Sequence, residues 1–145
     1  MRRISAQVEI EAPPERVWDV LADFESYAEW NPFMESVTGQ ALRGAWLRIS
    51  LRGRGGHRLR FKARVLACQR PSVLAWEGRG WAWWPGLLHG ERQITIEPIP
   101  GGRSRVQMQT TFTGLLSSWM RWLDHYRPSF EEMELALKRQ AEGSQ

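Results

Sequence analysis

A long apolar stripe near the C-terminus is the feature that most constrains the fold. On a helix of 3.6 residues per turn, eight apolar side chains fall on one face: Trp119, Trp122, Leu123, Tyr126, Phe130, Met133, Leu137 and Ala141. Pro128 would cost about 3 kcal/mol inside such a helix, but burial of each large apolar side chain contributes roughly 1.5–3 kcal/mol. We therefore predict one long, curved helix, or alternatively two helices that meet at Pro128. Either form requires a broad apolar surface opposite it.

The ends and the polar side of this helix also carry signals. Ser118 is a suitable N-cap, and Gly143 is a suitable C-terminal stop. Glu134 and Lys138 are four residues apart, so we predict an ion pair between them on the helix surface.

The first thirty residues predict a strand and two short helices. Apolar and polar residues alternate from Ile4 to Glu11, which is typical of a half-buried strand. Pro14 is placed as the first residue of a helix whose apolar face includes Val17, Val20, Leu21 and Phe24. A second short helix, capped by Asp23, is expected to end before Pro32.

From Glu35 onward the apolar pattern has a period of two and predicts about six strands. The clearest strand places Leu59, Phe61, Ala63, Val65 and Ala67 on one face and basic residues on the other. Each of two later strands places a set of side chains on the inward face. The first set is Arg92, Ile94 and Ile96, and the second is Val106, Met108, Thr110 and Phe112. One wet face favours antiparallel pairing, so the chain is predicted to be α+β, with a sheet that curls around the terminal helix. A groove between sheet and helix would suit a small apolar ligand.

Composition limits the classes of function. The 145 residues are expected to form one domain, 1–145. The sequence has no apolar signal core and no stretch long enough to span a membrane, so we expect a soluble, cytoplasmic protein. Cys68 is the single cysteine, so we expect no disulfide. Basic residues occupy the polar phase of the strands (Arg48, Arg52, Arg58, Arg60, Lys62 and Arg64), and the net charge is +4. We interpret them as a solvated sheet face, with a phosphate-binding surface as the alternative.

Several short motifs make the chain resemble a known superfamily. They are Ile10-Glu11-Ala12-Pro13, Trp30-Asn31-Pro32, Leu74-Ala75-Trp76, Pro85-Gly86-Leu87, Gly90-Glu91-Arg92 and Thr111-Phe112-Thr113-Gly114. Over essentially its whole length the chain is similar to the START/Bet v 1-like (SRPBCC) superfamily, in its bacterial polyketide cyclase/dehydrase-like branch. The resemblance implies a helix-grip fold: a curved seven-stranded antiparallel sheet wrapped around a long C-terminal helix, with two short helices after the first strand and a hydrophobic cavity between sheet and helix.

Members of this superfamily bind lipids, hormones or polyketides, catalyse cyclisation, or stimulate a chaperone ATPase. Relatives often carry His where this chain has Arg92, and a carboxylate where it has Thr110. These departures favour binding over acid–base catalysis.

Arg92 is the central polar candidate. Its strand phase points inward, where an unpaired charge is costly, so it must either bind an anionic ligand group or pair internally with a carboxylate such as Asp124 or Glu91. His89 is a candidate donor or base, or else a surface residue of a hairpin. The other candidate ligand-binding residues are mostly aromatic and line the groove or its mouth: Trp30, Phe33, Phe61, Trp76, Trp81, Met108, Thr110, Phe112, Trp119, Trp122, Tyr126, Phe130 and Met133.

The sequence therefore predicts a protein that binds a small hydrophobic ligand, with Arg92 and Thr110 holding one polar end. The alternatives are a polyketide cyclase or aromatase, and a protein-interaction module built on the tryptophan-rich connection 81–84. No catalytic constellation, metal site or cofactor motif is visible, and we expect no cofactor, no nucleic acid and no stable membrane insertion. Both a monomer and a homodimer are compatible with the sequence.

Overall fold

The computed structural model describes residues 2–52, 58–79, 89–113 and 127–143. Within these residues, one strand is followed by three short helices, then by six strands and finally by a longer helix. In chain order the elements are β1 (Arg2–Ile10), α1 (Pro14–Ala22), the 3-10 helix η1 (Phe24–Ser26), α2 (Tyr27–Trp30), β2 (Met34–Thr38), β3 (Trp46–Arg52), β4 (Arg58–Gln69), β5 (Val73–Arg79), β6 (His89–Ile99), β7 (Arg103–Thr113) and α3 (Arg127–Gly143).

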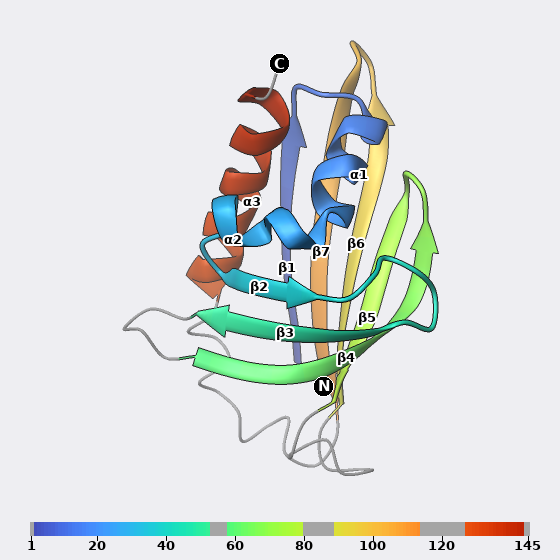
Figure 1. Ribbon diagram of the computed structural model, residues 1–145. Helices are drawn as coiled ribbons and strands as arrows, with labels where there is room; N and C mark the ends of the chain where they lie inside the picture. Colours follow the sequence, from blue (N-terminus) through green and yellow to red (C-terminus); the bar gives the residue numbers. More distant parts are fainter. Residues whose placement is uncertain (1, 53–57, 80–88, 114–126, 144–145) are drawn as a thin grey trace.

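The strands form one seven-stranded antiparallel sheet in the order β1-β7-β6-β5-β4-β3-β2. The sheet curls, so that β2, β3 and the first part of β4 run across the direction of the other strands, and β4 then bends to run alongside β5 (Figure 1). Helix α3 packs against β1 and α1, and α2 packs against β2. The predicted α+β helix-grip architecture is confirmed.

The core lies between the inner face of the sheet and the helices. Its fully buried members come from every layer, including Leu47, Ile94, Val106, Met133 and Leu137. Burial of side chains of this size stabilises the fold by roughly 1.5–3 kcal/mol each, which ties α3 to the sheet.

The first two helices begin and end where the prolines predict. Pro14 is the first residue of α1, and α2 ends at Trp30, before Asn31 and Pro32. The Asn31 carboxamide oxygen accepts hydrogen bonds from the backbone N–H groups of Phe33 and Met34, both at 2.9 Å, and this holds the turn into β2.

The predicted capping role of Asp23 is wrong. No backbone N–H of η1 is capped by its side chain, which instead accepts a hydrogen bond of 2.7 Å from the Ser26 hydroxyl. A hydroxyl three residues along the chain competes with the backbone for the carboxylate.

A bulge in β4 changes the phase that simple alternation predicts. Val65 lies opposite Trp76, but the register then shifts, and Ala67 lies opposite Ala75 while Cys68 lies opposite Leu74. The extra residue moves Ala67 off the inner face, where the sequence had placed it. Cys68 takes the inward position and packs against the core, and burial raises the pKa of its thiol.

Helix α3 confirms the apolar stripe from Phe130 onward, with Met133, Leu137 and Ala141 all buried. The stretch 119–126 lies outside the described residues. Pro128 lies in the first turn of α3, where its missing N–H costs nothing, and the helix ends at Gly143 as predicted.

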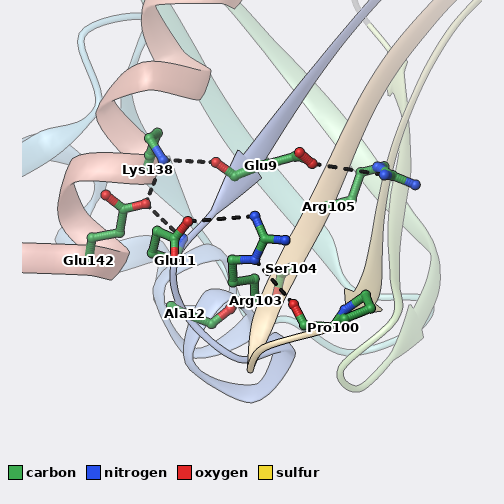
Figure 2. Close-up of polar contacts among 9 residues, drawn as sticks. All are labelled: Glu9, Glu11, Ala12, Pro100, Arg103, Ser104, Arg105, Lys138 and Glu142. Carbon is green, nitrogen blue, oxygen red and sulfur yellow. Dashed lines mark hydrogen bonds and ion pairs between the residues drawn. The ribbon is translucent and has the colours of Figure 1, made fainter.

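The predicted Glu134–Lys138 ion pair is wrong. Lys138 pairs one turn further on with Glu142, at 2.6 Å, because Glu134 points into the protein. The same ammonium donates to the Glu9 carbonyl at 2.9 Å, and the Glu142 carboxylate accepts from the backbone N–H of Glu11 at 2.7 Å (Figure 2). The hydrogen bond from the Glu11 N–H lowers the pKa of Glu142 most, and the hydrogen bond from Lys138 lowers it further. These contacts hold the end of α3 to the end of β1.

A buried hydroxyl joins β7 to the segment after β1. The Ser104 side chain is fully buried and donates to the Ala12 carbonyl at 2.7 Å (Figure 2). We expect Ser104→Ala to lower the free energy of unfolding by about 1–3 kcal/mol, because a buried carbonyl loses its donor. Urea denaturation measures this, with exposed Ser5→Ala as the control. Equal stability of the two variants would contradict it.

Candidate functional site

Arg92 lies in the middle of a row of inward side chains that crosses five strands. The cross-strand partners are, in order, Ile4, Thr110, Arg92, Trp76 and Val65, and all five are buried. Alternation along β6 places Arg92 on the same face as Ile94 and Ile96, as the sequence predicts. A guanidinium thus projects from the centre of the sheet toward the helices, with 6% of the residue exposed.

The groups around this guanidinium are mostly apolar. Its Nη2 lies 3.3 Å from the sulfur of Met108 and 3.2 Å from the sulfur of Met133, and its central carbon lies 4.7 Å from the centre of the Phe130 ring. Thioether sulfurs are weak acceptors. The Nε–H group is buried and has no acceptor among the described residues. Arg92 therefore retains hydrogen-bonding capacity.

One carboxyl group, that of Glu134, shares this environment. The residue is 4% exposed, and its Oε1 atom has no hydrogen-bond donor among the described residues. Burial raises the pKa of Glu134 to about 7, an effect that the charge of Arg92 partly opposes. Burial also lowers the pKa of Arg92 to about 10, so Arg92 stays cationic at neutral pH while Glu134 is only partly ionised.

The predicted internal partners of Arg92 do not include this carboxyl. Glu91 is the neighbour of Arg92 along β6 and pairs with Thr111 on the opposite face, so alternation directs it away; Asp124 lies outside the described residues. Glu134 was missed, although it follows Phe130 by four residues and precedes Leu137 by three. A carboxylate inside the apolar stripe was the signal.

Aromatic side chains from the early helices close one side of the site. Tyr27 of α2 is fully buried, its hydroxyl donates to the Leu21 carbonyl, and its ring meets those of Phe24 and Trp30 edge-on. Burial raises the pKa of the Tyr27 phenol, which therefore stays neutral. Phe24 also meets Trp76 edge-on, and Phe33 packs on Phe130 with ring centres 4.8 Å apart.

The predicted ligand-binding residues fall into three groups. The first group lies around Arg92 and either contacts it or is directly opposite it on a neighbouring strand: Met108, Met133, Phe130, Trp76 and Thr110. Four lie further out, in or against the core: Trp30, Phe33, Phe61 and Phe112. Trp81, Trp119, Trp122 and Tyr126 lie outside the described residues, and His89 is placed only as the first residue of β6.

The next inward row beyond Arg92 contains very small residues. It runs from Phe112 through Gly90 and Gly78 to Ala63, which lies opposite Leu47. Two glycines and an alanine add almost no side-chain volume to the inner face next to the guanidinium.

Metal and membrane-span signals are absent from the described ranges. No three His, Cys, Asp or Glu side chains there come together as metal ligands. None of the described helices is long and apolar enough to cross a bilayer.

Comparison of structures shows the same fold in other proteins. Protein MLL2253 from Mesorhizobium loti has a TM-score of 0.75 at 18% identity, with 99% of each chain covered. The Aha1 dimer from Colwellia psychrerythraea has a TM-score of 0.73 at 18% identity, covering 98% of this chain and 97% of that one. The di-domain ARO/CYC BexL from the BE-7585A biosynthetic pathway has a TM-score of 0.71 at 15% identity, covering 99% of this chain and 50% of BexL.

Sequence comparison places the chain in a family. No curated protein matches it in sequence. The model of the family described as polyketide cyclase / dehydrase and lipid transport matches residues 1–142, nearly the whole chain. The chain therefore belongs to this family of SRPBCC type.

Proposed function

We propose that the protein binds a small hydrophobic ligand between the inner face of the sheet and α3, and that Arg92 holds an anionic oxygen at one end of this ligand. The observation that carries the proposal is the buried guanidinium of Arg92, whose Nε–H has no acceptor among the described residues and whose Nη2 contacts two thioethers. A carboxylate or enolate oxygen would supply the strong acceptor that these contacts lack. Thr110, directly opposite Arg92 on β7, is the second polar residue of this end.

The charges at the site support a ligand more than a purely internal pair. Glu134 interacts electrostatically with Arg92, but its pKa of about 7 leaves a large fraction protonated at neutral pH. No contact within 4 Å joins the two side chains as an ion pair in the described part of the chain. A buried cation that is only partly compensated binds an incoming anion favourably.

The apolar surroundings define the rest of the ligand. Trp76, Phe130, Met108 and Met133 offer ring faces and polarisable thioethers, which suit a flat or elongated hydrocarbon. The residues of the next row, Gly90, Gly78 and Ala63, have almost no side-chain volume, which supports a ligand position beside the guanidinium. The family description, with polyketides and lipids, names molecules of this kind.

A matched pair of ligands tests the role of Arg92. We expect a fatty acid with a fluorescent anthroyloxy group to bind about 10- to 100-fold more tightly than its methyl ester, since charge-assisted hydrogen bonds contribute roughly 1.5–3 kcal/mol. Arg92→Met should remove this difference, whereas exposed Arg3→Met should keep it. Fluorescence titration measures both. Equal affinity of the unmodified protein for acid and ester would refute the role of Arg92, and binding of neither would refute the proposed function.

A second candidate function, a polyketide cyclase, is favoured by Glu134. A carboxyl with a pKa of about 7 suits a general base or acid at neutral pH, and Arg92 lies where it would stabilise an enolate oxygen. In this reaction Glu134 takes a proton from a carbon between two carbonyls, and the resulting carbanion attacks another carbonyl of the same chain. The π bond of that carbonyl breaks to give an alkoxide, to which Glu134 returns the proton. Turnover of a polyketone that Glu134→Gln abolishes without loss of binding would support the enzyme.

A further inference from the structure

The outer face of β3 and β4 carries a continuous set of cations. Every second residue of β4 from Arg58 to Arg64 points outward, and β3 adds two more, so that six exposed basic side chains share the surface: Arg48, Arg52, Arg58, Arg60, Lys62 and Arg64. We call this set the basic face. Neighbouring members are about 7 Å apart along β4 and about 13 Å apart along β3, and directly opposite members are about 5 Å apart.

The register places like charges next to one another. Arg48 lies directly opposite Lys62, and Arg52 lies directly opposite Arg58. Cross-strand pairs of like charge are destabilising, so a folded protein gains nothing internally from this arrangement. In the described part of the chain, no hydrogen bond or ion pair engages Arg48, Arg52, Arg60 or Lys62. These cations are available to an external anion.

Acidic compensation is sparse and localised. Glu35 of β2 pairs with Arg58 at 2.9 Å and accepts a hydrogen bond of 2.8 Å from Ser50, and that hydrogen bond, more than Arg58, lowers the pKa of Glu35. Glu77 lies opposite Arg64. Without the basic face, the chain would carry 14 basic and 16 acidic residues, so its positive charge is concentrated on this surface.

A hollow in the same surface brings hydroxyl donors between the cations. The hollow has a volume of about 510 Å³ and is lined by Arg48, Arg60, Lys62, Ser36 and Thr38, and by Ser50, whose hydroxyl donates to the Glu35 carboxylate that also lines it. Guanidinium, ammonium and hydroxyl groups are the donors that bind phosphate oxygens. The hollow has the size and chemistry for a phosphate group with its neighbouring substituents.

Two large apolar side chains are exposed at the start of β3 and in the turn before it. Leu42 is 59% exposed in the turn that leads into β3, and Trp46, the first residue of β3, is 52% exposed. The Arg64 guanidinium lies 5.9 Å from the centre of the Trp46 ring. Tryptophan beside cations is the composition of protein surfaces that rest on the headgroup region of a bilayer.

We propose that the outer face of β2, β3 and β4 docks on an anionic phospholipid surface, with lipid phosphates among Arg48, Arg60 and Lys62 and with Leu42 and Trp46 entering the headgroup layer. Binding is peripheral and reversible, because it depends on surface charge and two apolar side chains. The aliphatic Leu42 distinguishes this surface from a nucleic-acid site, which would present several rings for stacking of successive bases, where this surface presents Trp46 beside an aliphatic side chain. Docking is independent of what the protein binds between sheet and helix, so the two proposals fail separately.

Vesicle sedimentation with a charge-reversal pair tests this inference. The full chain should bind phosphatidylcholine vesicles that contain phosphatidylserine, and not pure phosphatidylcholine vesicles, with binding that weakens as salt rises. Arg48→Glu/Lys62→Glu should weaken binding roughly thirtyfold or more, as expected for loss of two cations at an anionic membrane. The control Arg3→Glu/Arg139→Glu changes the net charge equally but lies elsewhere, and should bind as the unmodified protein does.

Further variants make every outcome decisive. If the Arg48→Glu/Lys62→Glu variant fails to fold, Arg48→Gln/Lys62→Gln removes the same two charges with a smaller perturbation. Leu42→Asp should weaken vesicle binding although it removes no cation. Equal loss in the two charge-reversal variants, no vesicle binding by the unmodified protein, or tighter binding to single-stranded DNA than to anionic vesicles in the same buffer would each overturn the inference.

Discussion

Arg92→Met is expected to stabilise the ligand-free protein by about 1–3 kcal/mol at neutral pH while it removes binding of the anionic ligand end. The guanidinium is buried, its Nε–H lacks an acceptor among the described residues, and its Nη2 contacts two thioethers. An apolar side chain of similar length avoids the desolvation of a charge and fills the same space. Loss of Arg92 also removes the cation that favours ionised Glu134, so that carboxyl becomes neutral and adds no buried charge.

Urea denaturation of the ligand-free protein measures this effect. Arg3→Met, an exposed position on β1, should change the free energy of unfolding by less than about 0.5 kcal/mol. A loss of about 3 kcal/mol or more in Arg92→Met would show that Arg92 serves the fold through an internal pair. A gain in stability joined to a loss of binding would place Arg92 among residues kept for function at a cost to stability.

The features that the sequence predicts well depend on local geometry. Alternation along a strand is set by the backbone, so the inward positions of Arg92, Trp76 and Met108 follow from spacing alone. Proline restricts its own backbone and that of the preceding residue, so the start of α1 and the end of α2 were also predictable. The seven-stranded topology came from the family resemblance.

The features that the sequence misses depend on contacts between distant segments. The bulge after Val65 moves Ala67 outward, and no local pattern marks it because Val, Leu, Ala and Cys suit either face. Lys138 pairs with Glu142 because β1 supplies the Glu9 carbonyl and the Glu11 N–H at that end of α3. The basic face was interpreted as ordinary solvated surface, since its continuity depends on the register between β3 and β4.

Glu134 shows how an expected pattern can conceal a buried ionisable residue. Its spacing from Lys138 suggested a surface ion pair, while its spacing from Phe130 and Leu137 placed it on the buried face. The two interpretations conflict, and burial decides between them because α3 packs on the sheet with that face. The result is a carboxyl whose ionisation opposes folding.

Glu134→Gln is therefore expected to stabilise the protein in a pH-dependent way. Burial raises the pKa of this carboxyl from its ordinary value of 4.5 to about 7 in the folded state. The folded protein then binds the proton more tightly than the unfolded chain, so stability falls as pH rises from about 4.5 to about 7 and is constant above. At pH 8 the ionised carboxyl costs about 3 kcal/mol, and glutamine, which stays neutral, avoids this cost.

Denaturation curves across pH test the sign as well as the size of this effect. The stability difference between Glu134→Gln and the unmodified protein should be largest at pH 8 and approach its minimum near pH 4.5. Exposed Glu15→Gln on α1 should change the free energy of unfolding by less than about 0.5 kcal/mol at both ends of this pH range. A difference that grows as pH falls would mean that ionised Glu134 is stabilised in the folded state by Arg92, and the guanidinium would then have a full internal partner in place of a ligand.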